Sequence, residues 1–421
     1  MMNNMISSRF SGASRLTLGT LPPVRPPVGR ARVTLAAGLA FILLLARAPA
    51  APAQDTATVE ARLQALLDDA IENGSTPGIM MRVEAPGSGL SFSGVAGVSD
   101  LATGTALTRD NPVRIASNTK TFLAAATLRL WEEGRLGLDD RLSEYLPEHV
   151  AEVLSADGYD LDAMTIRHLL THTSGLYDYA DRDLFVQAVF DDPYHRWTPE
   201  EQIGLAVEWG DPYGAPGEVY RYSDTGYVVL GLVLESAYGK PLALVLRELL
   251  EFERLGMHDT WLETLEDPPA GASDRAHQYM GERDTYDWDP SLDLYGGGGL
   301  VSTADDMATF MRALFTGGVY RDAATADTML TTVEGAGQGP DLSGMPMVPG
   351  RYRMGVEVLD RDGLALYMHT GFWGTLAAYM PGPDVAISIA VTQQQSRALF
   401  RVFAEALGVL EEALLAVPAG G

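Results

Sequence analysis

The chain has 421 residues, a formal charge of −26 and no cysteine. Its content of 46% hydrophobic and 20% charged residues is typical of a globular protein with a large core. The absence of cysteine excludes disulfides, thiolate catalysis, cysteine-ligated metals and a lipoprotein anchor. Because an acidic surface repels nucleic acid and anionic lipid, neither is expected as a partner.

Residues 1–53 differ in composition from the rest of the chain. They contain six arginines and no acidic residue, an apolar run from Val33 to Ala46, and then Ala51-Pro52-Ala53. This composition is typical of a secretory signal peptide, and the apolar run is shorter than the roughly 20 residues that a membrane-spanning helix needs. Cleavage would make the formal charge −32, because six positive charges would be lost. We predict a periplasmic or secreted protein with no stable membrane insertion after signal cleavage; an uncleaved membrane anchor is the alternative.

Helical and strand patterns then follow one another in a distinctive order. The apolar spacing predicts a helix over 55–73, and strands over 79–84 and 90–95 around a turn at Ala85–Gly89. The middle of the chain is predicted to be mostly helical, with helices over 117–133, 166–171, 199–209, 228–238 and 304–315. Strands are expected again over 352–359, 364–369, 375–380 and 385–391, before a helix over 397–415.

This order predicts an α/β fold. Strands from both ends of the chain would form one antiparallel sheet flanked by helices, and a mostly helical lobe would be inserted into it. We expect a sheet lobe over about 54–116 and 341–415, and a helical lobe over about 117–340. Residues 416–421 are expected to form a disordered tail.

The segment Ser117-Asn118-Thr119-Lys120 has the S-x-x-K spacing at the start of a predicted helix. Residues three apart lie on one helical face, and a serine hydroxyl becomes nucleophilic when a neighbouring base takes its proton. A buried lysine can be that base, and the apolar run that follows, 122–126, predicts burial. Of the 30 basic residues only Lys120 and Lys240 are lysine, which suggests that position 120 requires a cation able to lose its proton. An N-capping serine with a solvated lysine is the ordinary alternative for so short a pattern.

Two later motifs add to this pattern. Tyr222-Ser223-Asp224 precedes an apolar helix, and His369-Thr370-Gly371 ends a strand before Phe372. A tyrosine near a lysine can pass a proton to a leaving group, and a Thr-Gly at a strand end lets a substrate backbone approach closely. A packed tyrosine and an ordinary turn are the alternatives for each motif alone.

Together the motifs resemble the serine β-lactamase and penicillin-binding protein superfamily. The similarity is to the branch of class C β-lactamases, D-alanyl-D-alanine carboxypeptidases and β-lactamase-like esterases, and it covers nearly all of residues 55–415. The S-x-x-K, Y-x-N-like and H-T-G elements occur in the order of that family, as do the phrases Thr165–Gly175, Tyr222–Tyr227 and Gly297–Ala304. The resemblance implies a β-lactamase/transpeptidase-like fold and one serine hydrolase domain over 54–415.

The resemblance also implies roles for individual residues. Ser117 would attack a carbonyl, Lys120 and Tyr222 would move protons, and His369 would take the place of the lysine of the third motif. The backbone N–H groups of Ser117 and Phe372 would form the oxyanion hole. No cofactor or metal is implied, and the partner would be a small ester, peptide or lactam substrate. The residues expected to bind it are Asp224, Thr370, Gly371 and Phe372.

Two departures from the family pattern bear on the substrate. Asp224 stands where asparagine is usual; an ionised aspartate only accepts hydrogen bonds, and its charge would favour a protonated Lys120. Phe372 stands where penicillin-recognising members often have a hydroxyl or a small residue. We therefore predict an exported serine hydrolase that forms an acyl-Ser117 intermediate and resembles D-alanyl-D-alanine carboxypeptidases and β-lactamases. A carboxylesterase is the alternative, and a non-catalytic binding or sensor protein on the same scaffold is a further one. The sequence carries no signal for an oligomeric state.

The histidines allow two further expectations. An ordinary histidine pKa near 6.5 at His369 would produce an activity change at mildly acidic pH. His168 and His172 have the spacing of zinc ligands on a helix, but packing or capping is the preferred interpretation.

Gly296–Gly299 is interpreted as a wall of the active-site cleft rather than a phosphate loop.

Overall fold

The computed structural model describes residues 55–414, except 182, 294, 334–336, 339–351, 362 and 395. The predicted signal peptide, 1–53, and the predicted tail, 416–421, lie outside the described residues.

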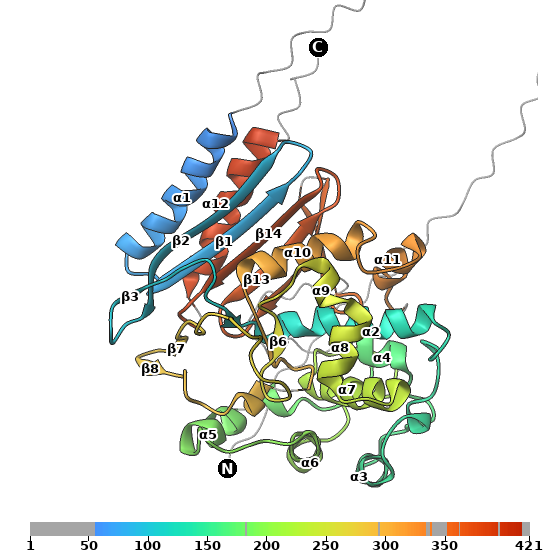
Figure 1. Ribbon diagram of the computed structural model, residues 1–421. Coiled ribbons are helices and arrows are strands. Elements are labelled where there is room, and N and C mark those ends of the chain that lie inside the picture. Colours follow the sequence, from blue (N-terminus) through green and yellow to red (C-terminus); the bar gives the residue numbers. More distant parts are fainter. Residues whose placement is uncertain are drawn as a thin grey trace, which may run out of the picture. The chain divides into compact units, whose positions relative to one another are not determined.

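One seven-stranded sheet joins the two ends of the described chain (Figure 1). Its strand order is β11-β12-β13-β14-β1-β2-β3, and every neighbouring pair is antiparallel. The strands are β1 Gly78–Ala85, β2 Leu90–Asp100, β3 Thr105–Ala106, β11 Glu357–Arg361, β12 Leu364–Gly371, β13 Thr375–Met380 and β14 Val385–Val391. The pairing of β1 with β14 confirms the predicted fold class, an antiparallel sheet built from both ends of the chain.

Helices cover both faces of this sheet. Helices α1 (Thr56–Glu72) and α12 (Arg397–Leu414) lie side by side on one face, and α10 (Ala304–Phe315) crosses the other (Figure 1). Side chains of a strand alternate between faces, so Ile79 and Met81 of β1 join the core under α1 and α12, while Met80 joins the second core. The central strands β1, β13 and β14 are thus buried on both sides, and this explains their almost continuous apolar sequences.

The remaining elements lie between β3 and β11 in the sequence. The α-helices are α2 Thr119–Glu132, α3 Glu148–Ala156, α4 Ile166–Leu170, α5 Asp183–Asp191, α6 Pro199–Trp209, α7 Asp224–Tyr238, α8 Leu242–Leu250, α9 Phe252–Leu255 and α11 Ala323–Met329. The 3₁₀ turns are η1 Ala116–Asn118, η2 Leu142–Glu144, η3 Tyr179–Asp181 and η4 Pro290–Asp293. Short strands pair as β4 Val113–Arg114, β9 Leu300–Ser302 and β6 Trp261–Leu262, as β5 Val219–Tyr220 with β10 Gly337–Gln338, and as β7 Tyr279–Met280 with β8 Arg283–Asp284. Within the described residues, no single helix has the length and apolar content to cross a membrane, and the bent pair α7 and α8 passes that test only jointly.

Helix α2 is the central helix of the second core. From Thr119 to Leu130 all of its residues are buried, and Phe122 stacks on Phe310 of α10 with ring centroids 3.7 Å apart. Its first turn is tied to β9, because the backbone N–H of Leu300 donates to Thr119 Oγ1 at 3.2 Å. The residues at the start of α2 are therefore held by packing on several sides.

One strand prediction was wrong. The segment 352–359 was expected to be a strand, but β11 begins only at Glu357, and Tyr352 makes a single isolated bridge. The cause is Gly355, which has φ of +75° and packs so closely on α2 that a Cβ there would lie 2.6 Å from the Cβ of Ala124. The chain before β11 therefore turns toward α2 instead of extending the sheet.

We predict that the contact between α1 and the sheet is a main source of stability. Leu67 of α1 is fully buried, so Leu67→Ala should lower the free energy of unfolding by about 2–5 kcal/mol, since it leaves a cavity. The control Leu101→Ala, at a side chain that is 55% exposed, should change it by less than about 0.5 kcal/mol. Urea unfolding followed by circular dichroism measures both, and equal losses would contradict the assigned packing.

Candidate active site

Ser117 lies on a tight 3₁₀ turn just before α2. Ala116 has φ of +46°, a left-handed conformation that costs energy for a residue with a Cβ and is found preferentially at functional sites. Ser117 itself is partly exposed, whereas its neighbours Ala116 and Asn118 are buried. The turn therefore holds Ser117 in place at the edge of a pocket that this residue lines.

The Lys120 side chain is completely buried and has three hydrogen-bond acceptors. Its Nζ donates to Ser117 Oγ at 2.9 Å, to Asp224 Oδ1 at 2.5 Å and to the carbonyl oxygen of Gly297 at 2.7 Å. An ammonium group has three protons, so these contacts satisfy all of them. The Ser117 hydroxyl also lies 3.3 Å from the same carbonyl oxygen.

Helix α7 supplies the other half of this cluster. Ser223 caps the helix by accepting from the backbone N–H of Gly226, and Asp224 occupies its first turn, where a negative charge is favoured. Tyr222 precedes the cap, and its ring lies 5.0 Å from Lys120 Nζ. Burial, followed by the charge of Asp224, raises the pKa of Tyr222 well above 10, against the opposing effect of a hydrogen bond with Ser117. Tyr222 is thus a neutral phenol at physiological pH.

His172 packs against this tyrosine. It has φ of +54°, its ring lies 4.2 Å from that of Tyr222, and its Nδ1 accepts from the backbone N–H of Ser223 at 3.1 Å. Burial, followed by the charge of Lys120, lowers its pKa well below 6.5, so the ring is neutral. His168, by contrast, caps α4, where its Nδ1 accepts from the Thr165 N–H. The expectation of packing and capping for this histidine pair is confirmed.

His369 lies on β12 and is 3% exposed. Its Nδ1 donates to the Thr370 carbonyl oxygen at 2.7 Å, so Nε2 accepts from the Tyr352 hydroxyl at 3.2 Å. Burial, followed by the charge of Lys120, lowers the pKa of His369 to about 3. The expectation that His369 titrates at mildly acidic pH is therefore wrong, because the folded protein holds the ring neutral.

The end of β12 packs against the turn that carries Ser117. A Cβ on Gly371 would lie 2.2 Å from the Ile115 carbonyl oxygen, so only glycine allows this approach. The next residue, Phe372, is 42% exposed and lines the cleft together with Ser117, while the carbonyl of Thr370 is occupied by His369. Of the residues Thr370, Gly371 and Phe372, only Phe372 lines the cleft beside Ser117.

A mostly apolar pocket of about 690 Å³, part of it open to solvent, lies beside Ser117. Its polar lining includes two carboxylates, Asp224 and Asp293, and none of its described lining residues is basic. The glycine run makes room for both acids: a Cβ on Gly297 would lie 3.3 Å from Asp224 Oδ1, and one on Gly298 would lie 2.3 Å from Asp293 Oδ2. The rest of the lining is Tyr179, Ala180, Phe185, Val186, Val189, Phe190, Met280, Trp288, Leu292, Phe372 and Trp373.

Comparison with known proteins agrees with this geometry. The beta-lactamase family model matches residues 63–409, which is most of the chain. The chain belongs to the beta-lactamase family. The family resemblance read from the motifs is thereby confirmed, and so is the general class of serine hydrolase.

The names of the similar proteins state different activities. The D-alanyl-D-alanine-carboxypeptidase/endopeptidase AmpH of Escherichia coli is 29% identical over 68% of this chain and 71% of its own length. Esterase EstB of Burkholderia gladioli is 33% identical over 50% of this chain and 53% of its own. The crystal structure of a D-stereospecific amidohydrolase from Streptomyces superimposes with a TM-score of 0.66 and 26% identity, over 81% of this chain and 97% of that one.

Sequence reasoning missed several residues of the site. Tyr352 was assigned to a strand, His172 was considered only as packing or a zinc ligand, and Asp293 was not considered at all. Asp293 follows an irregular aromatic stretch that has no motif, so no pattern pointed to it. The glycine run was the one available signal, since adjacent glycines often mark a close approach of other groups.

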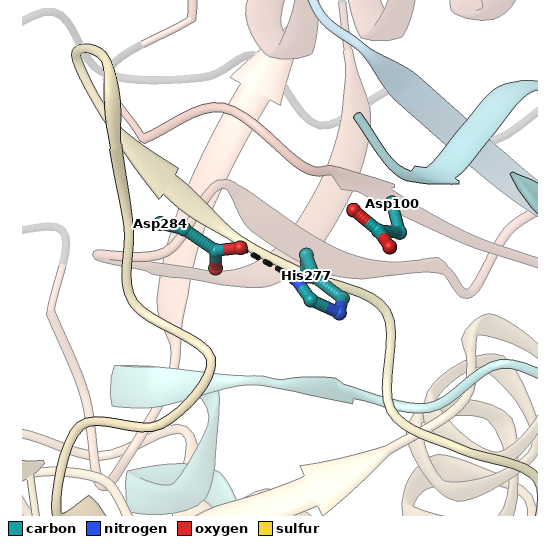
Figure 2. Close-up of side chains that lie close together, drawn as sticks. All are labelled: Asp100, His277 and Asp284. Atoms are coloured by element: carbon teal, nitrogen blue, oxygen red, sulfur yellow. Dashed lines mark hydrogen bonds and ion pairs between the residues drawn. The ribbon is translucent and has the colours of Figure 1, made fainter. Parts of the chain in front are cut away.

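A second group of titratable residues lies away from this pocket. Ligand atoms of Asp100, His277 and Asp284 lie within 4.8 Å of one another (Figure 2). His277 Nδ1 donates to Asp284 Oδ2 at 2.6 Å, and Asp100 accepts from the Ala102 N–H and the Thr103 hydroxyl, both at 2.7 Å. The link between β2 and the segment leading into the β7–β8 hairpin comes from the backbone N–H of His277, which donates to the carbonyl oxygen of Ser99 at 2.8 Å.

We predict that the folded protein keeps His369 neutral down to about pH 4. The lowered pKa means that the unfolded chain binds a proton below pH 6.5 while the folded chain does not, so stability falls as the pH falls below 6.5. NMR titration of the histidine ring protons, assigned with His369→Gln, measures the first effect, and urea unfolding of both proteins at pH 7 and pH 5 measures the second. A His369 resonance that shifts between pH 5 and pH 8 would contradict the assigned burial.

Proposed function

We propose that this protein hydrolyses small esters or amides through an acyl-Ser117 intermediate. The observation that carries the proposal is the contact of the buried Lys120 ammonium with the Ser117 hydroxyl, on a strained turn that opens into the pocket. Residues 54–415 would form this hydrolase domain, and residues 1–53 would export it.

The hydrogen bonds of Lys120 in the resting site bear on how acylation would begin. All three protons of Lys120 are bonded, and Tyr222 is a neutral phenol, so the lysine must first give up a proton. Asp224 Oδ1, at 2.5 Å, is the acceptor within reach. Lys120 then takes the Ser117 proton while the serine oxygen bonds to the substrate carbonyl carbon.

Collapse of the tetrahedral intermediate breaks the bond to the leaving group. That group takes the proton that came from Ser117, delivered by Lys120 through Tyr222. The oxyanion would be held by the backbone N–H groups of Ser117 and Phe372, because Gly371 brings this strand end against the nucleophile turn. Water then attacks the acyl-enzyme, releases the acid and returns the proton to the serine oxygen.

The pocket favours a neutral or cationic substrate over an anionic one. Penicillins and peptides ending in D-alanine carry a carboxylate, which Asp224 and Asp293 would repel. An esterase or amidase activity therefore fits the pocket better than a carboxypeptidase or β-lactamase activity. This choice accords with the esterase and the amidohydrolase among the similar proteins, while the similarity to AmpH supports the carboxypeptidase alternative.

We predict that Ser117→Ala abolishes turnover. Intact-mass spectrometry with p-nitrophenyl butyrate, a penicillin and diacetyl-Lys-D-Ala-D-Ala, with product release followed in parallel, should show a transient adduct with the ester. Ser117→Ala should lose the adduct and at least about a thousandfold in rate. The control Ser155→Ala, at an exposed serine of α3, should keep both. An unchanged rate in Ser117→Ala would refute the mechanism, and no adduct with any compound would favour the binding or sensor alternative.

We predict that Asp224→Asn changes selectivity. The substitution removes a charge that repels carboxylates and adds an amide donor, whatever its effect on the absolute rates. The ratio of penicillin acylation to p-nitrophenyl butyrate acylation should rise at least about tenfold. Asp267→Asn, at an exposed carboxylate outside the pocket, is the control of equal charge. An unchanged ratio would show that Asp224 does not select against anionic substrates.

A further inference from the structure

Asp293 is a pocket carboxylate with no assigned partner. It ends the η4 turn, and its carboxyl group lies flat against Gly298, where a Cβ would be 2.3 Å from Oδ2. It lines the same pocket as Ser117 and Asp224. A side chain at position 298 would displace the Asp293 carboxyl group, so the present position of this group requires glycine at 298.

One oxygen of the Asp293 carboxylate, Oδ2, lacks a hydrogen-bond partner of ordinary geometry. This atom is shielded from solvent and unpartnered, and so is Nε1 of the neighbouring Trp373. The indole lies close enough to lower the pKa of Asp293 but makes no hydrogen bond of ordinary geometry. Buried carboxylates are normally paired, because an unpaired one costs several kcal/mol.

The charges around Asp293 leave its own charge uncompensated. Burial, followed by the charge of Asp224, raises the pKa of Asp293 to about 7, against the opposing effects of Lys120, Arg114 and Trp373. Lys120 donates its three protons to other acceptors. Arg114 is engaged with Glu263 at 2.7 Å and with the carbonyl oxygens of Thr285 and Trp288. Among the described residues that line the pocket there are therefore two carboxylates and no cation that would balance them.

We propose that Asp293 binds the ammonium group of the substrate, and that the natural substrates are esters or amides with a free amino group and an apolar side chain. An ammonium group that reached the Asp293 carboxylate from the pocket would supply a further donor and a positive charge. The apolar wall formed by Phe185, Val189, Phe190 and Trp288 would receive the side chain, and Ser117 would attack the carbonyl. This inference rests on the proposed hydrolase function and specifies its substrate class.

The kinetic test compares two substrates that differ only at the amino group. Phenylalanine methyl ester and its N-acetyl derivative, each as both enantiomers, are assayed at pH 7. For the preferred enantiomer, kcat/KM should be about ten- to a hundredfold higher for the free amine. Asp293→Asn should reduce this ratio to within about threefold of unity. The matched control Asp287→Asn, which removes the same charge from an exposed carboxylate of the same loop, should keep it.

A binding test decides the proposal independently of catalysis and of any variant. Calorimetry with the wild-type protein should show 2-phenylethylamine binding at least about tenfold more tightly than 2-phenylethanol at pH 7.5. This affinity should weaken as the pH falls through 7, because protonation of Asp293 removes the negative charge. Asp293→Asn should remove the difference between the two compounds.

The outcomes separate this proposal from the proposed function. Hydrolysis of p-nitrophenyl butyrate without any preference for the free amine would overturn the role of Asp293 and leave the hydrolase intact. Absence of all turnover with tight, Asp293-dependent binding of 2-phenylethylamine would refute the hydrolase and retain the ammonium site. Equal binding of the amine and the alcohol would overturn the ammonium site in either case.

Discussion

The site depends on the burial of a single ammonium group. Lys120 lies inside the core at the first turn of α2, and it is compensated by a hydroxyl, a carboxylate and a carbonyl from three separate segments. An unpaired buried cation would be strongly unfavourable, so these segments must reach the lysine together. The burial of Lys120 thus fixes the relative positions of the nucleophile turn, the start of α7 and the glycine run.

The aromatic and imidazole rings packed near Lys120 are buried and neutral. Tyr222, His172, Tyr352 and His369 pack in succession behind the lysine, and burial raises the pKa of the phenols and lowers that of the imidazoles. A low-dielectric layer of uncharged rings strengthens the interaction between Lys120 and Asp224. The pocket beside Ser117 differs from this layer, because its mostly apolar lining includes the carboxylates of Asp224 and Asp293.

Some expectations succeeded because the signal was local, and others failed because it was not. Helices such as Pro199–Trp209 carry their own start signals, here a capping box between Thr198 and Glu201, and the strands 375–380 and 385–391 are continuous apolar runs. The segment 352–359 was also expected to be a strand, yet packing of Gly355 on α2 shortened it. His369 was placed in the right motif, but its titration depended on burial, which no pattern reports.

Local sequence patterns were sufficient to predict the fold class and the family. They also predicted the proximity of Ser117 to Lys120, because helical spacing places residues three apart on one face. The motif order also placed Tyr222, Asp224 and Phe372 near this pair. Three features became visible only in the folded structure: all three protons of Lys120 are bonded, His369 is neutral, and Asp293 lies beside Ser117 with an unpartnered Oδ2. Hydrogen-bond partners, desolvation and the sum of nearby charges depend on residues far apart in the chain, such as Lys120 and Gly297, and these meet only when the whole core has packed.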